Sequence, residues 1–201
     1  MHQSLIIYRY RNAIEQVTIW QQKQNHLQKG LFALAFACIT GIFAQLRVYL
    51  PWTPIPITLQ TVAVFSSGLI LGGFYGSLSQ IIYVILGIMG IPWFANNQKG
   101  LAIVSSPTMG YLFGFILASF LIGAYSSDLL ERTTNTKTFL LKILLINFGI
   151  IYGLGMLHLL IWYFLSFGLW LTIGALLMKG VVPFILGDIL KISVLTMFVK
   201  L

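Results

Sequence analysis

The chain ends in the apolar stretch Val181-Val-Pro-Phe-Ile-Leu-Gly-Asp-Ile-Leu-Lys-Ile-Ser-Val-Leu-Thr-Met-Phe-Val199, which carries Asp188 and Lys191 three residues apart. About 20 apolar residues are enough to cross the roughly 30 Å hydrocarbon core of a bilayer. A charged Asp or Lys near the centre of a membrane helix costs roughly 2.5–3.5 kcal/mol on insertion scales. The pair is therefore a candidate functional site. A self-satisfied structural ion pair is the alternative.

The composition of the chain is that of a membrane protein. Hydrophobic residues make up 58% of the 201 residues, charged residues only 8%, and the mean hydropathy is +0.91. Soluble domains do not have this composition, so an all-α integral membrane protein is predicted, with a membrane domain at 29–201 and a polar cytoplasmic tail at 1–28. The net charge of +8 comes from bases scattered between apolar segments, which argues against nucleic acid as a partner.

The apolar segments predict six transmembrane helices. Their approximate ranges are 30–49, 57–71, 74–90, 107–126, 138–167 and 181–200. The prolines between Pro51 and Pro56 exclude a helix between the first two spans, and Gly72-Gly73 predicts a tight turn between the second and third. Residues 168–180 form an apolar connection with room for a short helix.

The distribution of bases predicts the orientation. Six spans put both termini on one side of the membrane. That side holds eight bases, Arg9, Arg11, Lys23, Lys29, Arg132, Lys137, Lys142 and Lys200, and the other side holds three, Arg47, Lys99 and Lys179. The positive-inside rule then places both termini in the cytoplasm, which suits a multi-pass membrane protein. The loops 51–56 and 91–106 would face outward, and Asp188, roughly 10 Å deep, would lie beneath them in an outward-opening pocket.

Motifs for chemistry on a substrate are absent from the sequence. It contains no Walker sequence or Gly-rich phosphate loop, so any use of ATP would belong to another chain. One cysteine and three scattered histidines give no metal-ligand spacing. We therefore expect no cofactor, no metal and no catalytic residue. A membrane enzyme that uses Asp188 as a base, and a purely structural protein, are the rival classes.

The polar residues near the outer side suit a ligand with two different ends. Lys191 offers three donors for a carboxylate, and Asp188 offers acceptors for the paired N–H groups of a cyclic urea or amide. Further candidates lie in the outer loops and at the start of the fourth span: Thr58, Gln60, Trp93, Asn97, Gln98 and Tyr111. Polar groups satisfied within their own helices, and an aromatic belt at the interface, are the alternative interpretations.

Four stretches together resemble the BioY family, the substrate-binding S component of biotin transporters of the energy-coupling factor class. They are Pro54-Ile-Pro-Ile-Thr-Leu-Gln-Thr61, Gly87-Ile-Met-Gly-Ile-Pro-Trp-Phe94, Ser106-Pro-Thr-Met-Gly-Tyr-Leu-Phe-Gly-Phe115 and Val181-Val-Pro-Phe-Ile-Leu-Gly-Asp-Ile-Leu-Lys191. The resemblance covers the chain from about residue 30 to its C-terminus.

The resemblance implies a six-helix bundle that captures external biotin for import. Lys191, with an amide from the 96–98 loop, would hold the carboxylate of biotin, and Asp188 would accept from its ureido ring. Gln98 takes the position of a polar pocket residue of the family, in a loop that usually has more glycine. A different carboxylated vitamin is the alternative ligand.

The resemblance also implies partner subunits. A membrane coupling subunit and ATPase subunits would supply the energy. The alternative is a solitary importer, for which a homo-oligomer is expected. Ala33 and Ala37 lie four residues apart in the first span, where small residues let another helix approach closely. That partner could be a helix of the same bundle, whereas the resemblance implies that it is the coupling subunit.

Overall fold

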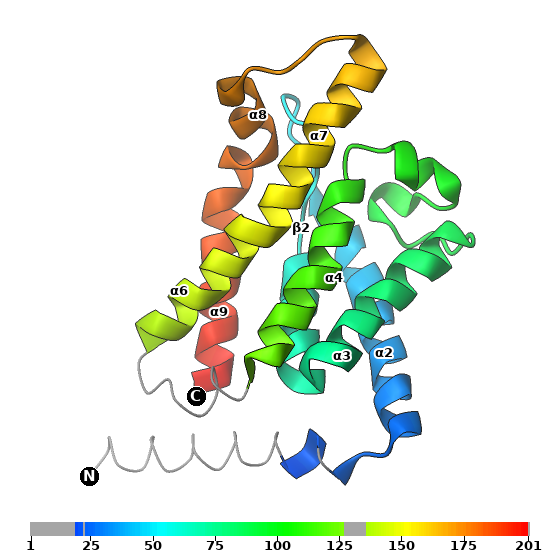
Figure 1. Ribbon diagram of the computed structural model, residues 1–201, viewed down its shortest axis with the longest axis vertical. Coiled ribbons are helices and arrows are strands. Elements are labelled where there is room, and N and C mark those ends of the chain that lie inside the picture. The colour runs from blue at the N-terminus through cyan, green and yellow to red at the C-terminus, as the bar shows by residue number, and fades with distance from the viewer. Residues whose placement is uncertain (1–18, 22, 127–135, 201) are drawn as a thin grey trace.

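The computed structural model is a bundle of membrane-crossing helices (Figure 1). It describes residues 19–21, 23–126 and 136–200. The main helices are α2 (His26–Gln45), α3 (Gln60–Ile88), α4 (Met109–Ala124), α6 (Thr136–Ile146), α7 (Tyr152–Phe167), α8 (Ile173–Gly180) and α9 (Ile185–Lys200). Because α3 consists of two spans, and α6 and α7 form one, the bundle crosses the membrane six times, as predicted.

Helix α3 is long because it contains two helical segments, which are separated by a break at Gly72. The backbone of Gly72 has φ 78° and ψ 175°, which is not helical, and only glycine adopts this region readily. Gln60 donates a hydrogen bond to the hydroxyl of Tyr83, 23 residues later, at 3.0 Å. In a straight helix these residues would be roughly 35 Å apart. The helix therefore reverses direction at Gly72, which confirms the predicted turn.

Glycines allow the two halves of α3 and helix α4 to approach closely at this turn. A Cβ added to Gly76 would lie 2.8 Å from the Cα of Gly68, and one added to Gly123 would lie 2.3 Å from main-chain atoms of Gly72 and Gly73. No side chain fits at such distances. The turn is thus packed backbone against backbone, as in other tight membrane helix contacts.

Fully buried polar side chains join the helices above this turn. Gln80 Nε2 lies 3.2 Å from Ser67 Oγ and 3.4 Å from Thr40 Oγ1, and Ser67 pairs with Ser119 at 2.9 Å. All four side chains have 0% exposure. Since these residues come from α2, both halves of α3, and α4, the cluster ties four spans together in the apolar interior.

Helix α2 begins earlier than the sequence predicted. Asn25 caps it by accepting from the N–H of Gln28 at 2.8 Å, and the Gln28 side chain accepts from the N–H of Asn25 at 3.0 Å. This is a capping box, so the helix starts at His26 rather than near residue 30, and it ends at Gln45. The first part of the predicted tail, residues 1–18, lies outside the described residues.

The N-terminal segment contacts the turn of α3. The Gln21 side chain donates to the main-chain oxygen of Ile70 at 2.8 Å, and the His26 ring lies 2.7 Å from the hydroxyl of Tyr75. These contacts join the N-terminal segment to the part of α3 on either side of its break at Gly72.

At the opposite end of the bundle, loops cover the helix ends (Figure 1). A small hairpin pairs β1 (Arg47–Val48) with β2 (Ile57–Thr58), and it carries the proline-rich loop. The 91–106 loop contains two short 3-10 helices, η1 (Ala95–Asn97) and η2 (Leu101–Ser105). Gln45 of α2 holds this loop by donating to the main-chain oxygens of Trp93 and Phe94, both at 3.0 Å.

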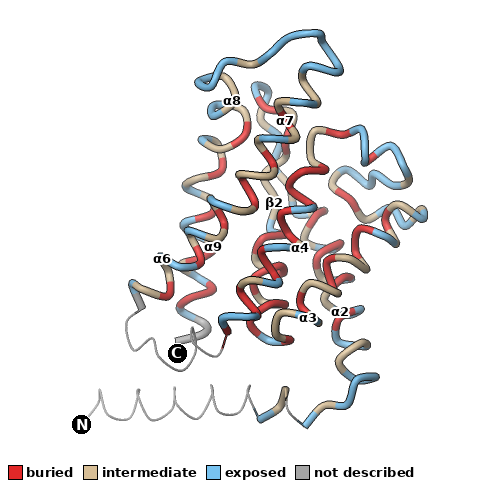
Figure 2. The backbone as a smooth tube through the Cα atoms, viewed as in Figure 1, coloured by how far each residue is buried: buried red, intermediate tan, exposed pale blue. Residues whose placement is uncertain are grey.

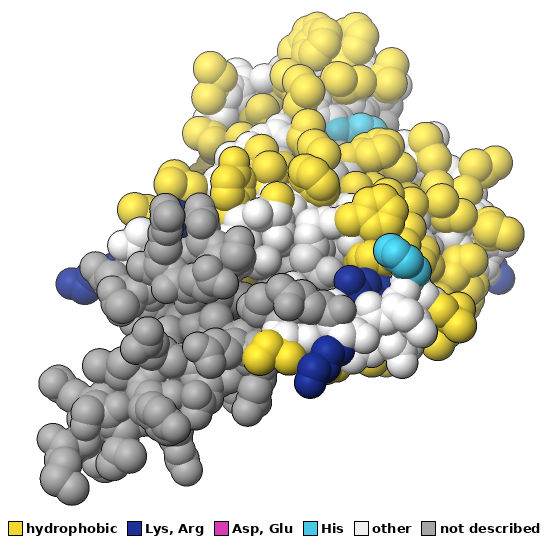
Figure 3. All heavy atoms as spheres, turned by 60° about the horizontal axis from the view of Figure 1, so that its bottom comes forward, with side chains coloured by type: hydrophobic (Ala, Val, Ile, Leu, Met, Phe, Trp, Pro, Cys, Tyr) yellow, Lys and Arg dark blue, Asp and Glu magenta, His cyan; other side chains and the backbone are white. Residues whose placement is uncertain are grey.

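The fifth and sixth spans have irregular features. A π-helical turn, η3 (Asn147–Ile151), joins α6 to α7, and a 3-10 turn, η4 (Val182–Phe184), leads into α9. The connection at 168–180 contains α8, the short helix for which the sequence left room. Figure 2 shows buried positions concentrated where the helices pack together, whereas apolar side chains cover much of the described surface seen in Figure 3, as expected for a protein in lipid.

Candidate ligand-binding site

A cavity lies between the helices at the end of the bundle that carries the β1–β2 hairpin and the 91–106 loop. The space between its lining atoms is about 620 Å³, a figure that includes the open mouth. Its walls are built from the hairpin, the loop and helices α3, α4, α7 and α9. The lining residues used below are Thr58, Gln60, Thr61, Tyr83, Phe94, Ala95, Tyr111, Phe115, Tyr152, Phe184, Asp188 and Lys191.

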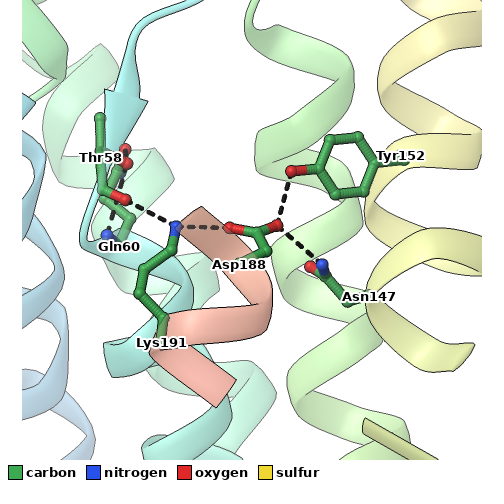
Figure 4. Close-up of polar contacts among 6 residues, drawn as sticks. All are labelled: Thr58, Gln60, Asn147, Tyr152, Asp188 and Lys191. Atoms are coloured by element: carbon green, nitrogen blue, oxygen red, sulfur yellow. Dashed lines mark hydrogen bonds and ion pairs between the residues drawn. The ribbon is translucent and has the colours of Figure 1, made fainter. Parts of the chain in front are cut away.

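Asp188 and Lys191 face this cavity from the start of α9. Their spacing put them on one face of the helix, as predicted, and the Lys191 Nζ atom lies 2.5 Å from Asp188 Oδ1. Asp188 is only 1% exposed. Nζ also donates to the main-chain oxygen of Thr58 at 2.9 Å, so Lys191 joins the sixth span to the β1–β2 hairpin (Figure 4).

The second oxygen of Asp188 has two partners that the sequence did not identify. Asn147 Nδ2 donates to Oδ2 at 2.7 Å, and the hydroxyl of Tyr152 donates to the same atom at 2.5 Å. Figure 4 shows the carboxylate between these two donors and Lys191. The protein thus supplies three hydrogen-bond donors to this one buried carboxylate. The available signal was Asn147 itself, a polar residue in an apolar span.

Thr58, Gln60 and Tyr111 line the cavity, but their polar groups have protein partners. Thr58 Oγ1 donates to Gln60 Oε1 at 3.0 Å, and Gln60 in turn donates to Tyr83. The Tyr111 hydroxyl donates to the Gly180 carbonyl at 2.9 Å, near the end of α8. These three predicted residues are thus assembled around one space, where they also hold its walls together.

The structure places Trp93, Asn97 and Gln98 outside the lining. The Trp93 indole donates to the main-chain oxygen of Tyr83 at 2.9 Å, and its ring packs against Gly41. Asn97 and Gln98 are exposed at the tip of the loop. Instead, the residues of the 91–106 loop that reach the cavity are Phe94, Ala95 and Ile103.

Much of the remaining wall is aromatic. Phe94, Phe115 and Phe184 are buried there, and the Tyr111 and Tyr152 rings meet edge to face with centroids 6.0 Å apart. Such walls suit the apolar body of a ligand with polar ends. Thr61 Oγ1 is also buried on the wall, and it has no hydrogen-bond partner within the described parts of the chain.

Ala33 and Ala37 lie inside the bundle. Both have 0% exposure, on the same face of α2 as Thr40, whose hydroxyl contacts Gln80 of α3. Their small size thus serves packing between α2 and α3. The expectation that these two alanines face the coupling subunit is corrected accordingly, since a partner could contact them only if α2 moved.

Comparison with known proteins assigns the chain to a family. The sequence model of the BioY family matches residues 18–201. A protein of Methanothermobacter thermautotrophicus named probable biotin transporter BioY is 43% identical over 130 residues, which are 63% of this chain and 80% of that protein. The biotin transporter BioY of Thermotoga maritima is 39% identical over 159 residues, or 77% and 87% of the two chains.

The fold has a counterpart among solved structures. The crystal structure of the S-component for biotin from an ECF-type ABC transporter superposes with a TM-score of 0.75, covering 88% of this chain and 93% of that one. Its sequence is 22% identical, so this likeness concerns the fold alone. The match of the family model across the six spans carries the assignment: the chain belongs to the BioY family.

Proposed function

We propose that this chain is the membrane subunit that captures biotin and delivers it to the cytoplasm with an ATP-driven energising module. One observation carries the proposal: in a bundle of the BioY family, the Asp188–Lys191 ion pair lines a cavity whose other walls are polar and aromatic. The alignment with this chain covers most of the length of two relatives that are named biotin transporters. The ligand is bound and released unchanged, so the chain is a transporter and not an enzyme.

The two charged residues recognise opposite ends of the ligand. Biotin has a carboxylate, which suits the Lys191 ammonium, and a ureido ring whose N–H groups suit the Asp188 carboxylate. In the structure the two side chains are paired at 2.5 Å. The ligand carboxylate therefore competes with Asp188 for Lys191, and the ureido N–H competes with Lys191 for Asp188. Binding replaces one ion pair by two charge-assisted contacts.

The remaining contacts are shared between the walls and the loop. The thiophane ring lies against the aromatic wall, and Thr58, Gln60, Tyr111 and the unpartnered Thr61 hydroxyl are further polar contacts. Trp93, Asn97 and Gln98 contact the ligand if the loop tip folds over the mouth. Asn97 and Gln98 would then bring an amide to the carboxylate, because both are exposed beside Ala95 on the cavity wall.

The orientation follows from the charges. Both termini lie in the cytoplasm of a prokaryote, and the cavity opens to the outer face of the plasma membrane. Arg9, Arg11 and Arg132, on which this assignment partly depends, lie outside the described residues. A membrane coupling subunit and ATPase subunits dock from the inside and supply the energy. If the protein works alone, it does so as a homo-oligomer.

Direct binding tests the proposal. Purified protein in detergent is incubated with radiolabelled biotin, and unlabelled vitamins compete. We expect saturable binding that biotin displaces and other carboxylated vitamins do not. Displacement by another vitamin at lower concentration would reassign the ligand, and absence of biotin binding by folded protein would refute the proposal. Recovery of a chemically altered ligand would favour an enzyme.

A further inference from the structure

The two oxygens of the Asp188 carboxylate have different surroundings. Oδ1 contacts Lys191, whereas Oδ2 accepts from both Asn147 and Tyr152 at 2.7 and 2.5 Å. Figure 4 shows Lys191 on one side of the carboxylate and the two neutral donors on the other. A carboxylate oxygen has about two lone-pair sites. The lone pairs of Oδ2 are therefore occupied by the protein itself.

The π-helical turn η3 is what brings the two donors together. Asn147 and Tyr152 are five residues apart, and in an α-helix that spacing separates two side chains by about 140° around the axis. In η3 the N–H of Tyr152 bonds to the carbonyl of Asn147 instead, as an i→i+5 bond requires. This wider turn places both side chains on the same side of the span, facing Asp188.

Both donors are packed inside the bundle. Asn147 is 0% and Tyr152 is 5% exposed, and the Tyr152 ring stacks on Phe148 with centroids 5.1 Å apart. Hydrogen bonds to a charged acceptor in a buried site are strong and directional. A side chain fixed in this way can determine the orientation of the carboxylate that it contacts.

We propose that Asn147 and Tyr152 are positioning residues for ligand binding, which hold Oδ2 of Asp188 so that Oδ1 alone is offered to an N–H group of the ligand. The inference rests on the proposed function for the identity of that ligand. It also changes the expectation that Asp188 accepts both ureido N–H groups. One of them bonds to Oδ1, and the other requires a different acceptor.

The composition of the chain allows a direct test. Asp188 and Asp128 are its only aspartates, so in an Asp128→Asn background labelled with ¹³C-aspartate, the isotope-shifted infrared carboxylate band reports Asp188 alone. The test variants are Tyr152→Phe, which removes a single oxygen atom, and Asn147→Leu. Tyr163→Phe, on the same helix but away from Asp188, is the matched control. Biotin affinity is measured for the same proteins.

We expect Tyr152→Phe to shift the Asp188 band without biotin present and to weaken biotin binding about tenfold, whereas Tyr163→Phe does neither. Tyr152→Phe keeps the ring, so it tests the inference even if Asn147→Leu does not fold. An unshifted band with tenfold weaker binding would mean that Tyr152 contacts the ligand itself, and would overturn the positioning role. An unshifted band with unchanged affinity would overturn it too.

The two proposals fail in different ways. If the unsubstituted protein binds no biotin, the proposed function fails, but the infrared band still reports whether Tyr152 holds Asp188. If it binds biotin and Tyr152→Phe behaves like Tyr163→Phe in both measurements, the proposed function stands and the positioning role is refuted.

Discussion

Lys191 donates to the main-chain oxygen of Thr58 while it is ion-paired with Asp188, so one ammonium group connects the sixth span to the hairpin over the cavity. A ligand carboxylate that binds Lys191 therefore acts on both contacts at once. This relationship makes Lys191 the most informative residue to change.

Lys191→Met is expected to weaken biotin binding at least a hundredfold, because it removes the partner of the ligand carboxylate and leaves Asp188 as a buried, unpaired charge. Lys99→Met is the matched control, since Lys99 is an exposed lysine at the loop tip. Equilibrium binding of radiolabelled biotin measures both. Equal losses for the two variants would remove Lys191 from the site.

The ion pair also predicts a pattern in stability. Asp188→Asn or Lys191→Met alone leaves one buried charge without its partner and should cost about 3 kcal/mol or more of unfolding free energy. The double variant removes both charges and should lose less than the sum of the single variants. Thermal unfolding in one detergent compares the four proteins. Additive losses would show that the charges do not stabilise each other.

The contact at the α3 turn predicts a steric effect at Gly123. A Cβ there would lie 2.3 Å from main-chain atoms of Gly72 and Gly73, so Gly123→Ala should destabilise the fold by about 1–3 kcal/mol or more. Gly153→Ala is the control, because a Cβ at Gly153 meets nothing within 4 Å. Thermal unfolding should separate them, and an unaffected Gly123→Ala would contradict the close packing.

The small residues of α2 allow a test of whether they pack against α3 or against another subunit. Ala33 is buried, so Ala33→Leu should lower the unfolding temperature by overpacking the contact with α3. Ala35 is exposed on the same helix, and Ala35→Leu should leave the unfolding temperature unchanged. If Ala33→Leu instead keeps full stability but loses co-purification with a coupling subunit, Ala33 belongs to an intersubunit contact after all.

Structural features that depend on residues close together in the sequence were predictable. Long apolar runs, the prolines of the 51–56 loop and the Gly72-Gly73 pair predicted the six spans and their turns, because each acts through the chain's own covalent geometry. The early start of α2 also has a local signature in the sequence, the capping box of Asn25 and Gln28.

Features that depend on partners distant in sequence were not predictable. The π-helical turn at Asn147–Ile151 differs from an α-helix by the register of a few hydrogen bonds. The side chains at its two ends, Asn147 and Tyr152, contact Asp188, which lies far away in the sequence. Likewise, the spacing of Ala33 and Ala37 indicates a close helix neighbour but does not say which one. The site residues Asp188 and Lys191 were found because a charge in lipid is costly wherever it lies.

The break at Gly72 has a consequence for topology. With a reversal there, α2 begins and α9 ends at the same end of the bundle, opposite the hairpin (Figure 1). If residues 60–88 crossed the membrane once as a straight helix, the number of crossings would be odd. Every later span would be inverted, and Asp188 would enter the bilayer from the wrong side. The number of crossings, and with it the end of the bundle from which α9 starts, thus depends on the reversal at Gly72, far from the cavity.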